Sequence, residues 1–352
     1  MTIPVSVTTE PNTPTRLPAS PEAGFSVVEV MMSTLLTLVM LGAAMGSLDD
    51  GLMMQENVGL SAEMHHNARI AMNQMTRDFM QAGQGLPTGG IPIPNGTGAA
   101  EIARPGPAPM TFGSGTQVLL PVTTGNAAGP LILGQMTDMV TIVYADSTLE
   151  LDVLPLVEIV GSGNLITVDA AIDIQVPSNR LEVGDLIMFS NALGHAVQMV
   201  TSLSGQDKVH FASSDPLELN QQTAPAGSLA QLEGPDGFPP TTATRIWMIT
   251  YYLDASVPDS PRLMRVVNDR TPRPVAMEIE GLQLTYDLVD GVINLAAVDT
   301  PVAPNSEAQI RKVNIALSAR SYKTHARTSE YQRQMLTSQV SLRNLSFFDR
   351  YL

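Results

Sequence analysis

The stretch Gly24-Phe25-Ser26-Val27-Val28-Glu29 stands at the head of a long apolar run, and the rest of the chain is organised around it. The 24 residues from 25 to 48 carry one formal charge, that of Glu29. At about 1.5 Å per residue, a helix over this run can cross the hydrocarbon core of a bilayer. A lone carboxylate near one end of a membrane helix is costly, so Glu29 is a candidate functional residue.

The composition narrows the classes of function. The chain has 352 residues, no cysteine and a formal net charge of −15. The absence of cysteine excludes thiol catalysis and thiolate metal sites. The acidic balance argues against a nucleic-acid partner, because such a partner is held by neutralising its phosphates. After the helix, roughly 270 residues remain for a folded body.

The segment ahead of the apolar run does not have the order of a secretory signal. Residues 1–24 are polar with prolines at 4, 11, 14, 18 and 21, which predicts a disordered leader. In a secretory signal, an apolar core precedes a small-residue cleavage site, whereas here Gly24 comes before the apolar run. The leader is therefore expected to have a different role.

Read together with the helix that follows it, the stretch from Gly24 to Glu29 resembles the prepilin peptidase site of type IV pilins and type II secretion pseudopilins. The resemblance implies cleavage after Gly24, N-methylation of Phe25 and a role for Glu29 in assembly. In a bundle of such helices, the new amino group of Phe25 in one subunit can neutralise the carboxylate of a neighbour. The leader departs from the family pattern, since Arg16 is its single basic residue.

Small residues inside the apolar run are candidate helix-packing positions. Gly42 and Gly46 have the small-xxx-small spacing that lets helices approach closely. Ordinary membrane-helix glycines explain the pair equally well.

Beyond the apolar run, the pattern predicts a second, amphipathic part of the same helix over residues 49–82. Residues of one apolar stripe recur at steps of three and four, and the helix is expected to end at Gly83 or Gly85. The stripe consists of Met64, Ala68, Met72, Met75, Phe79 and Ala82. Residues 67–83 also resemble the end of the long helix in PilW-type minor pilins and PulJ-type pseudopilins.

The remaining chain changes to a two-residue period and predicts a mainly antiparallel β-sheet. A Gly/Pro-rich loop region is expected over 83–136, and a β-rich body over 137–352. The expected strands are 139–144, 149–153, 154–160, 165–168, 186–189, 196–201, 209–211, 245–253, 263–267, 275–288 with a slip at Glu280-Gly281, 313–319 and 339–342. The predicted class is α+β, and the resemblance implies a pilin-like fold.

No pattern of residues indicates catalysis, a cofactor or a metal. The phosphate-binding loop, the zinc helix motif and the serine elbow are all missing from the sequence. The five histidines lack ligand spacing, and calcium stays open without a matching loop motif. Glu278 and Glu280 form a possible carboxylate pair, which we interpret as a solvated strand face.

These observations predict a minor pilin of PilW type, processed after Gly24 and built into a type IV pilus through its helix. Its implied partners are prepilin peptidase, other minor and major pilins, the inner-membrane assembly platform and membrane lipid. It would lie in a bacterial inner membrane with its body in the periplasm, and then at the pilus surface. Two alternatives are a PulJ-type pseudopilin and, from another class, a membrane-tethered binding or enzymatic domain.

Overall fold

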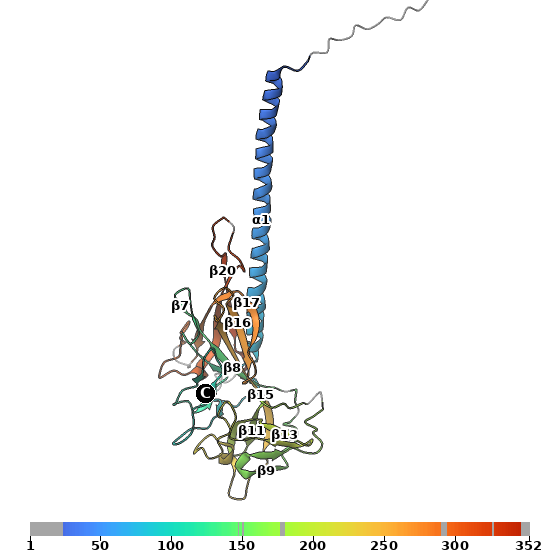
Figure 1. The fold of residues 1–352 in the computed structure, drawn as a ribbon. Helices are drawn as coiled ribbons and strands as arrows, with labels where there is room; N and C mark the ends of the chain where they lie inside the picture. Colours follow the sequence, from blue (N-terminus) through green and yellow to red (C-terminus); the bar gives the residue numbers. More distant parts are fainter. Residues whose placement is uncertain are drawn as a thin grey trace, which may run out of the picture. The chain divides into compact units, whose positions relative to one another are not determined.

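The protein is α+β, with one long helix followed by antiparallel strands (Figure 1). The computed structural model describes residues 24–146, 148–149, 151–176, 180–289, 294–325 and 327–345. The predicted leader therefore lies outside the described residues, except for Gly24. The chain forms two compact units, residues 1–56 and 57–352. Helix α1 (Val27–Gln81) contributes residues to both units.

In the first unit, the described chain is the beginning of α1. Its large apolar side chains are exposed; Leu38, for example, is 67% exposed and Met40 is 73% exposed. Helix α1 is long and apolar enough to cross a membrane, by length and composition. This property is what the sequence predicts for residues 25–48.

In the second unit, the continuation of α1 packs on the β-sheets with its predicted stripe. All six residues of that stripe are buried, and Met75, Phe79 and Ala82 have no exposed surface. They share one hydrophobic core with residues of the central sheet and of a three-stranded sheet. The amphipathic period thus identified the buried face correctly, because i, i+3 and i+4 side chains share one face of a helix.

Helix α1 ends where predicted, and the rest of the chain holds that end. Gly83 has a positive φ of 76°, and its N–H donates to the carbonyl of Val143 at 2.9 Å. The side-chain amide of Asn344 lies 3.3–3.4 Å from the carbonyl oxygens of residues 80, 81 and 82. The last carbonyls of a helix have no partner within the helix, so Asn344 supplies one from the far end of the chain.

A seven-stranded sheet is the centre of the body. Its order is β12-β11-β15-β16-β17, with β8 paired to β15 and β5 paired to β8. The strands are β5 (Val122–Thr123), β8 (Val140–Ala145), β11 (Leu186–Asn191), β12 (Gly194–Met199), β15 (Thr242–Asp254), β16 (Arg262–Val267) and β17 (Arg273–Met277). The first half of β15 pairs with β11 and the second half pairs with β16, so β15 links the two parts of this sheet.

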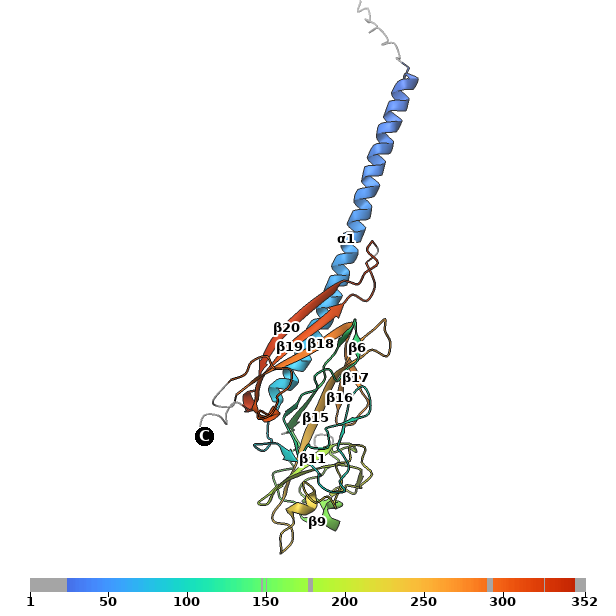
Figure 2. The ribbon, with the colours of Figure 1, turned by 90° about the vertical axis from the view of Figure 1, so that its left-hand side faces the viewer.

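A three-stranded sheet covers α1 from another side (Figure 2). It consists of β18 (Ile279–Leu288), β19 (Ile310–Arg320) and β20 (Arg333–Ser341), in that order. The chain passes from β17 to β18 at Glu278, whose φ of 59° ends one strand and begins the next. The register also shifts between Ile279 and Gly281, which confirms the predicted slip.

A smaller four-stranded sheet lies in a second lobe of the body, where β9, β11 and β13 are labelled in Figure 1. It has the order β13-β14-β10-β9 and packs a core that includes Ile166, Val209 and Phe211. Its strands are β9 (Glu158–Val160), β10 (Leu165–Thr167), β13 (Ser202–Ser204) and β14 (Lys208–His210). The predicted hairpin at residues 161–164 is confirmed, since β9 and β10 pair antiparallel around it.

The Gly/Pro-rich region from 83 to 136 contains buried residues and short strands as well as loops. Ile91 and Ile93 are fully buried, because they pack into a core with β11 and β12 residues. The segment forms three two-stranded pairs, β1–β4, β2–β3 and β6–β7. These strands are β1 (Ile91–Pro92), β2 (Ala103–Arg104), β3 (Met110–Thr111), β4 (Val118–Leu119), β6 (Leu131–Ile132) and β7 (Gln135–Met136).

Several expected strands differ from the structure; the one at 154–160, for example, begins only at Glu158, and the one at 275–288 is divided into β17 and β18. The described residues between 148 and 154 form turns and bends instead of a strand, although Leu149 and Leu151 are buried. The alternating pattern therefore occurs here in an irregular segment, whose two leucines pack in the core of the second lobe. The final strand, β20, begins at Arg333, six residues before the expected start at Gln339. The first residues of β20 are more polar than its end, so the pattern of apolar residues did not reveal them.

Candidate functional site

The head of α1 contains the predicted processing and assembly residues, and Glu29 has a local partner there. The Val28 N–H donates to the Ser26 hydroxyl at 3.3 Å, and the Ser26 N–H donates to Glu29 Oε2 at 3.2 Å. These bonds form a cap related to the capping box, with the Ser26 hydroxyl bound to the N2 donor, and they satisfy backbone donors that a helix start leaves free. The Ser-x-x-Glu spacing is the sequence signal of such a cap, but the sequence prediction for Glu29 considered only its charge. In a single chain, Glu29 therefore helps to begin the helix.

The three predicted glycines lie in open surroundings. A Cβ atom built at Gly24, Gly42 or Gly46 meets no heavy atom within 4 Å among the described residues. Phe25, beside the predicted cleavage position, is 85% exposed. The structure of one chain thus leaves the predicted processing position accessible and gives the glycine pair no partner within the described chain.

The end of α1 is fixed to the central sheet by a buried carboxylate that the sequence analysis did not single out. Asp78 is 2% exposed, and its Oδ2 accepts from the Tyr251 hydroxyl at 2.6 Å and from Arg265 Nε at 2.7 Å. Tyr251 lies on β15 and Arg265 on β16, at paired positions. Burial, followed by the charge of Asp78, raises the pKa of Tyr251.

Beside this contact lies a cavity of about 520 Å³ with aromatic and aliphatic walls. Tyr144 and Trp247 stand at paired positions on β8 and β15, and Val267 and Val275 continue the wall. Trp247 lies on the same face of β15 as Ile249 and Tyr251, which pack in the core with α1. The cavity thus opens on the same face of the sheet that α1 covers.

Three arginines also line this cavity, although the sequence shows no basic cluster. Arg265 and Arg273 are paired across the β16–β17 hairpin, and Arg270 lies in the turn between them. Their nearly symmetric spacing about the turn is the signal that could have revealed them, because hairpin partners share a face.

The remaining candidate residues have structural roles. Glu278 and Glu280 are 8% and 5% exposed, so the predicted solvated face is wrong. Glu278 pairs with Arg320 at 3.2 Å, and Glu280 pairs with Arg333 at 2.6 Å, both measured to the arginine Nε. Buried carboxylates require such partners. Sequence alternation alone could not show that β19 and β20 supply them.

The side-chain hydrogen bonds of the histidines join residues close in the sequence. His195 lies 2.8 Å from the Ser190 hydroxyl, and His210 lies 2.7 Å from the Ser204 hydroxyl. Within the described ranges, no three His, Cys, Asp or Glu side chains lie close enough to hold a metal ion.

Comparison of the chain with protein-family models, with curated proteins and with solved structures found no match.

Proposed function

We propose that this chain is a minor pilin of PilW type, cleaved by prepilin peptidase after Gly24 and built into a type IV pilus by its helix. The observation that carries the proposal is the placement of the Gly24–Glu29 motif at the head of α1. The helix bears exposed apolar side chains in the first unit and a buried stripe in the β-rich unit. One element can thus serve as membrane anchor, filament segment and core helix.

The proposed assembly step is an exchange of partners at Glu29. Before assembly, the Glu29 carboxylate accepts from the Ser26 N–H and completes the helix cap. Cleavage places a new ammonium group on Phe25, one residue before Ser26. In a packed bundle, the ammonium group of one subunit offsets the burial cost of the Glu29 carboxylate of its neighbour. The charge is then matched between chains in the filament.

The processing step is tested with Gly24→Leu in the full chain, expressed in a bacterium that has a prepilin peptidase. A Cβ at Gly24 meets nothing within 4 Å, so the substitution acts on recognition by the peptidase and not on the fold. We expect mass spectrometry to find a mature wild-type chain that begins at Phe25 and a full-length Gly24→Leu chain. Gly51→Leu is the matched control, because Gly51 is equally open. A Gly24→Leu product that still begins at Phe25 would refute the cleavage proposal.

The size of the body favours a pilus over secretion. The roughly 270 residues that follow the helix exceed what we expect of a PulJ-type pseudopilin. Both kinds of protein would be processed at Gly24, so the Gly24→Leu experiment does not separate them. Deletion of the gene separates them: loss of surface pili with normal protein secretion supports the pilus, and the opposite result supports the pseudopilin.

A further inference from the structure

The cavity between β15, β16 and β17 has a charge pattern that differs from the rest of the protein. The chain carries a formal net charge of −15, yet the residues lining this cavity include Arg265, Arg270 and Arg273 and no carboxylate. Surface charges more than about 8 Å away are largely screened at physiological salt. The charged groups closest to the cavity therefore set the potential that a bound molecule experiences.

Two of the three arginines have internal carboxylate partners that fix their positions. Arg265 is bound through Nε to Asp78 at 2.7 Å. Arg270 is bound to Glu182 at 2.9 Å and to Asp185 at 2.6 Å, and Asp185 is fully buried. Their charges are thus compensated within the body, and they serve mainly to shape the cavity wall.

Arg273 differs from its two neighbours. It is exposed, and among the residues that the structure describes no carboxylate lies within ion-pair distance of it. Its position on β17, opposite Arg265 on β16, brings it to the cavity. A guanidinium group presents two parallel N–H donors that match a carboxylate or a phosphate. Arg273 therefore provides the uncompensated charge of this site.

The apolar part of the lining is suited to an apolar or planar body. Tyr144, Trp247, Val267 and Val275 form it, and the volume of about 520 Å³ lies in the range of small-molecule sites. The guanidinium of Arg245 lies 4.7 Å from the Trp247 ring centroid and holds the indole in place. A rigid apolar wall with one uncompensated cation favours ligands that combine both features.

We propose that this cavity binds a small molecule whose apolar or planar body carries a carboxylate or phosphate group, with Arg273 as the residue that binds the oxyanion. This proposal is independent of the pilin function. Arg265 and Thr271, which also line the cavity, are placed to donate further hydrogen bonds to the same group.

Trp247 is the only tryptophan of the chain, so its fluorescence reports on this cavity alone. The full chain in a non-ionic detergent is titrated with benzoate, its neutral isostere benzamide, phenyl phosphate and inorganic phosphate. Isothermal titration calorimetry gives each affinity independently. We expect saturable binding of benzoate or phenyl phosphate, with benzamide weaker by about tenfold or more, as for loss of a charged hydrogen bond. The tighter of the two anions identifies the group as carboxylate or phosphate.

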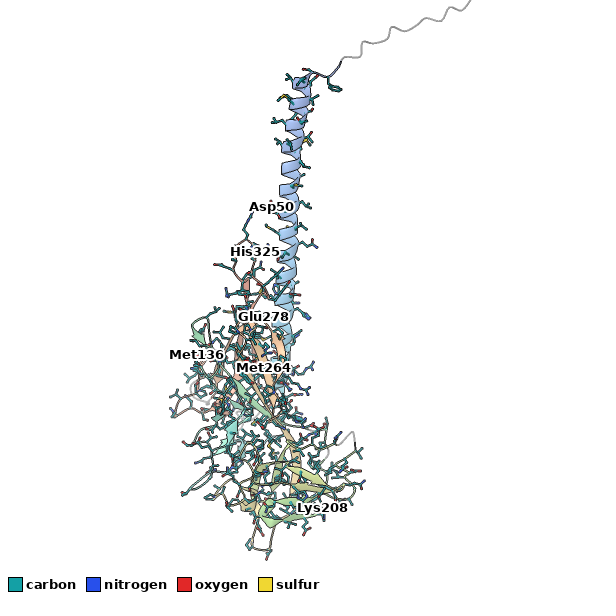
Figure 3. All side chains as sticks on the ribbon, viewed as in Figure 1. Asp50, Met136, Lys208, Met264, Glu278 and His325 are labelled. Carbon is teal, nitrogen blue, oxygen red and sulfur yellow. The ribbon has the colours of Figure 1, made fainter. Side chains whose placement is uncertain are left out.

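Arg273→Gln tests the residue, and Lys208→Gln is the matched control. Lys208 is exposed on β14 in the second lobe (Figure 3), so this control removes one positive charge elsewhere. We expect Arg273→Gln to weaken binding about tenfold or more at an unchanged unfolding midpoint, and Lys208→Gln to have no effect. Equal binding of benzoate and benzamide, equal loss in both variants, or no binding of any probe would overturn the proposal. Inorganic phosphate binding as tightly as phenyl phosphate would also overturn it, since the apolar wall would then contribute nothing.

Discussion

The carboxylate of Asp78, in the last turn of α1, accepts a hydrogen bond of 2.6 Å from the hydroxyl of Tyr251, in the second half of β15. The same oxygen accepts from Arg265 on the neighbouring strand. One buried atom thereby joins the helix to two strands of the central sheet. The helix is held by this polar contact as well as by its apolar stripe.

Replacing Asp78 by alanine should lower the free energy of unfolding by about 3–5 kcal/mol, because Arg265 then keeps a partly buried charge without its partner. Tyr251→Phe should cost only about 1 kcal/mol, since it removes one hydrogen bond and leaves the ion pair. Urea unfolding of the full chain in detergent, followed by Trp247 fluorescence, measures both. Equal losses in the two variants would show that the Asp78–Arg265 pair contributes little.

The observed capping contact of Glu29 and its proposed role in assembly can be separated by substitution. Glu29→Gln retains a side-chain oxygen that can accept from the Ser26 N–H, and glutamine also serves in capping boxes. Glu29→Ala removes both the cap and the charge. We expect Glu29→Gln to keep the helix content by circular dichroism and yet to be lost from sheared pili. Normal incorporation of Glu29→Gln would contradict the charge-matching step, whatever the behaviour of Glu29→Ala.

The two parts of α1 should respond differently to the same side-chain deletion. Met75 is fully buried in the core of the body, whereas Met54 is 70% exposed. Met75→Ala should therefore lower the free energy of unfolding of the body by about 2–5 kcal/mol. Met54→Ala should leave it within about 0.5 kcal/mol of wild type. Chemical unfolding of both variants tests the assignment, and a comparable loss in Met54→Ala would contradict it.

Alkaline pH should weaken the body through Tyr144. Burial, followed by the Asp78 charge, raises the pKa of Tyr144 to about 12. The ordinary value is about 10, so between these values the unfolded chain loses a proton that the folded chain keeps. The free energy of unfolding therefore falls as the pH rises through this window. Tyr144→Phe should show a shallower fall from about pH 9 to about pH 11. Unfolding free energies measured at neutral pH, where Tyr144 is protonated in both the folded and the unfolded chain, give the reference value for each protein.

The sequence predicted elements whose signal is local. The stripe from Met64 to Ala82 and the helix end near Gly83 depend on a repeat along one helix, so composition and period were enough. The alternation at Val313, Ile315 and Leu317 likewise identified the buried face of β19. The slip at Glu280-Gly281 was visible because a bulge changes the phase of the pattern.

The features that sequence reasoning missed depend on partners far along the chain. Asp78 meets Tyr251 across 173 positions, and Asn344 meets the end of α1 across more than 260. Glu280 looked solvated because its partner Arg333 belongs to a strand whose polar beginning gave no signal. The cavity that Arg273 lines was missed for the same reason. Tyr144 and Trp247 reach it from β8 and β15, far along the chain from Arg273.

The pairing of β15 also determines how the body carries mechanical load. Its 13 residues bond to β11 in one lobe and to β16 beside α1, with β8 along the opposite edge. A force applied along β15 would act in shear on many parallel hydrogen bonds at once, instead of opening them one by one. A pull on the second lobe would thus reach the strands that pack against α1 along one continuous backbone segment.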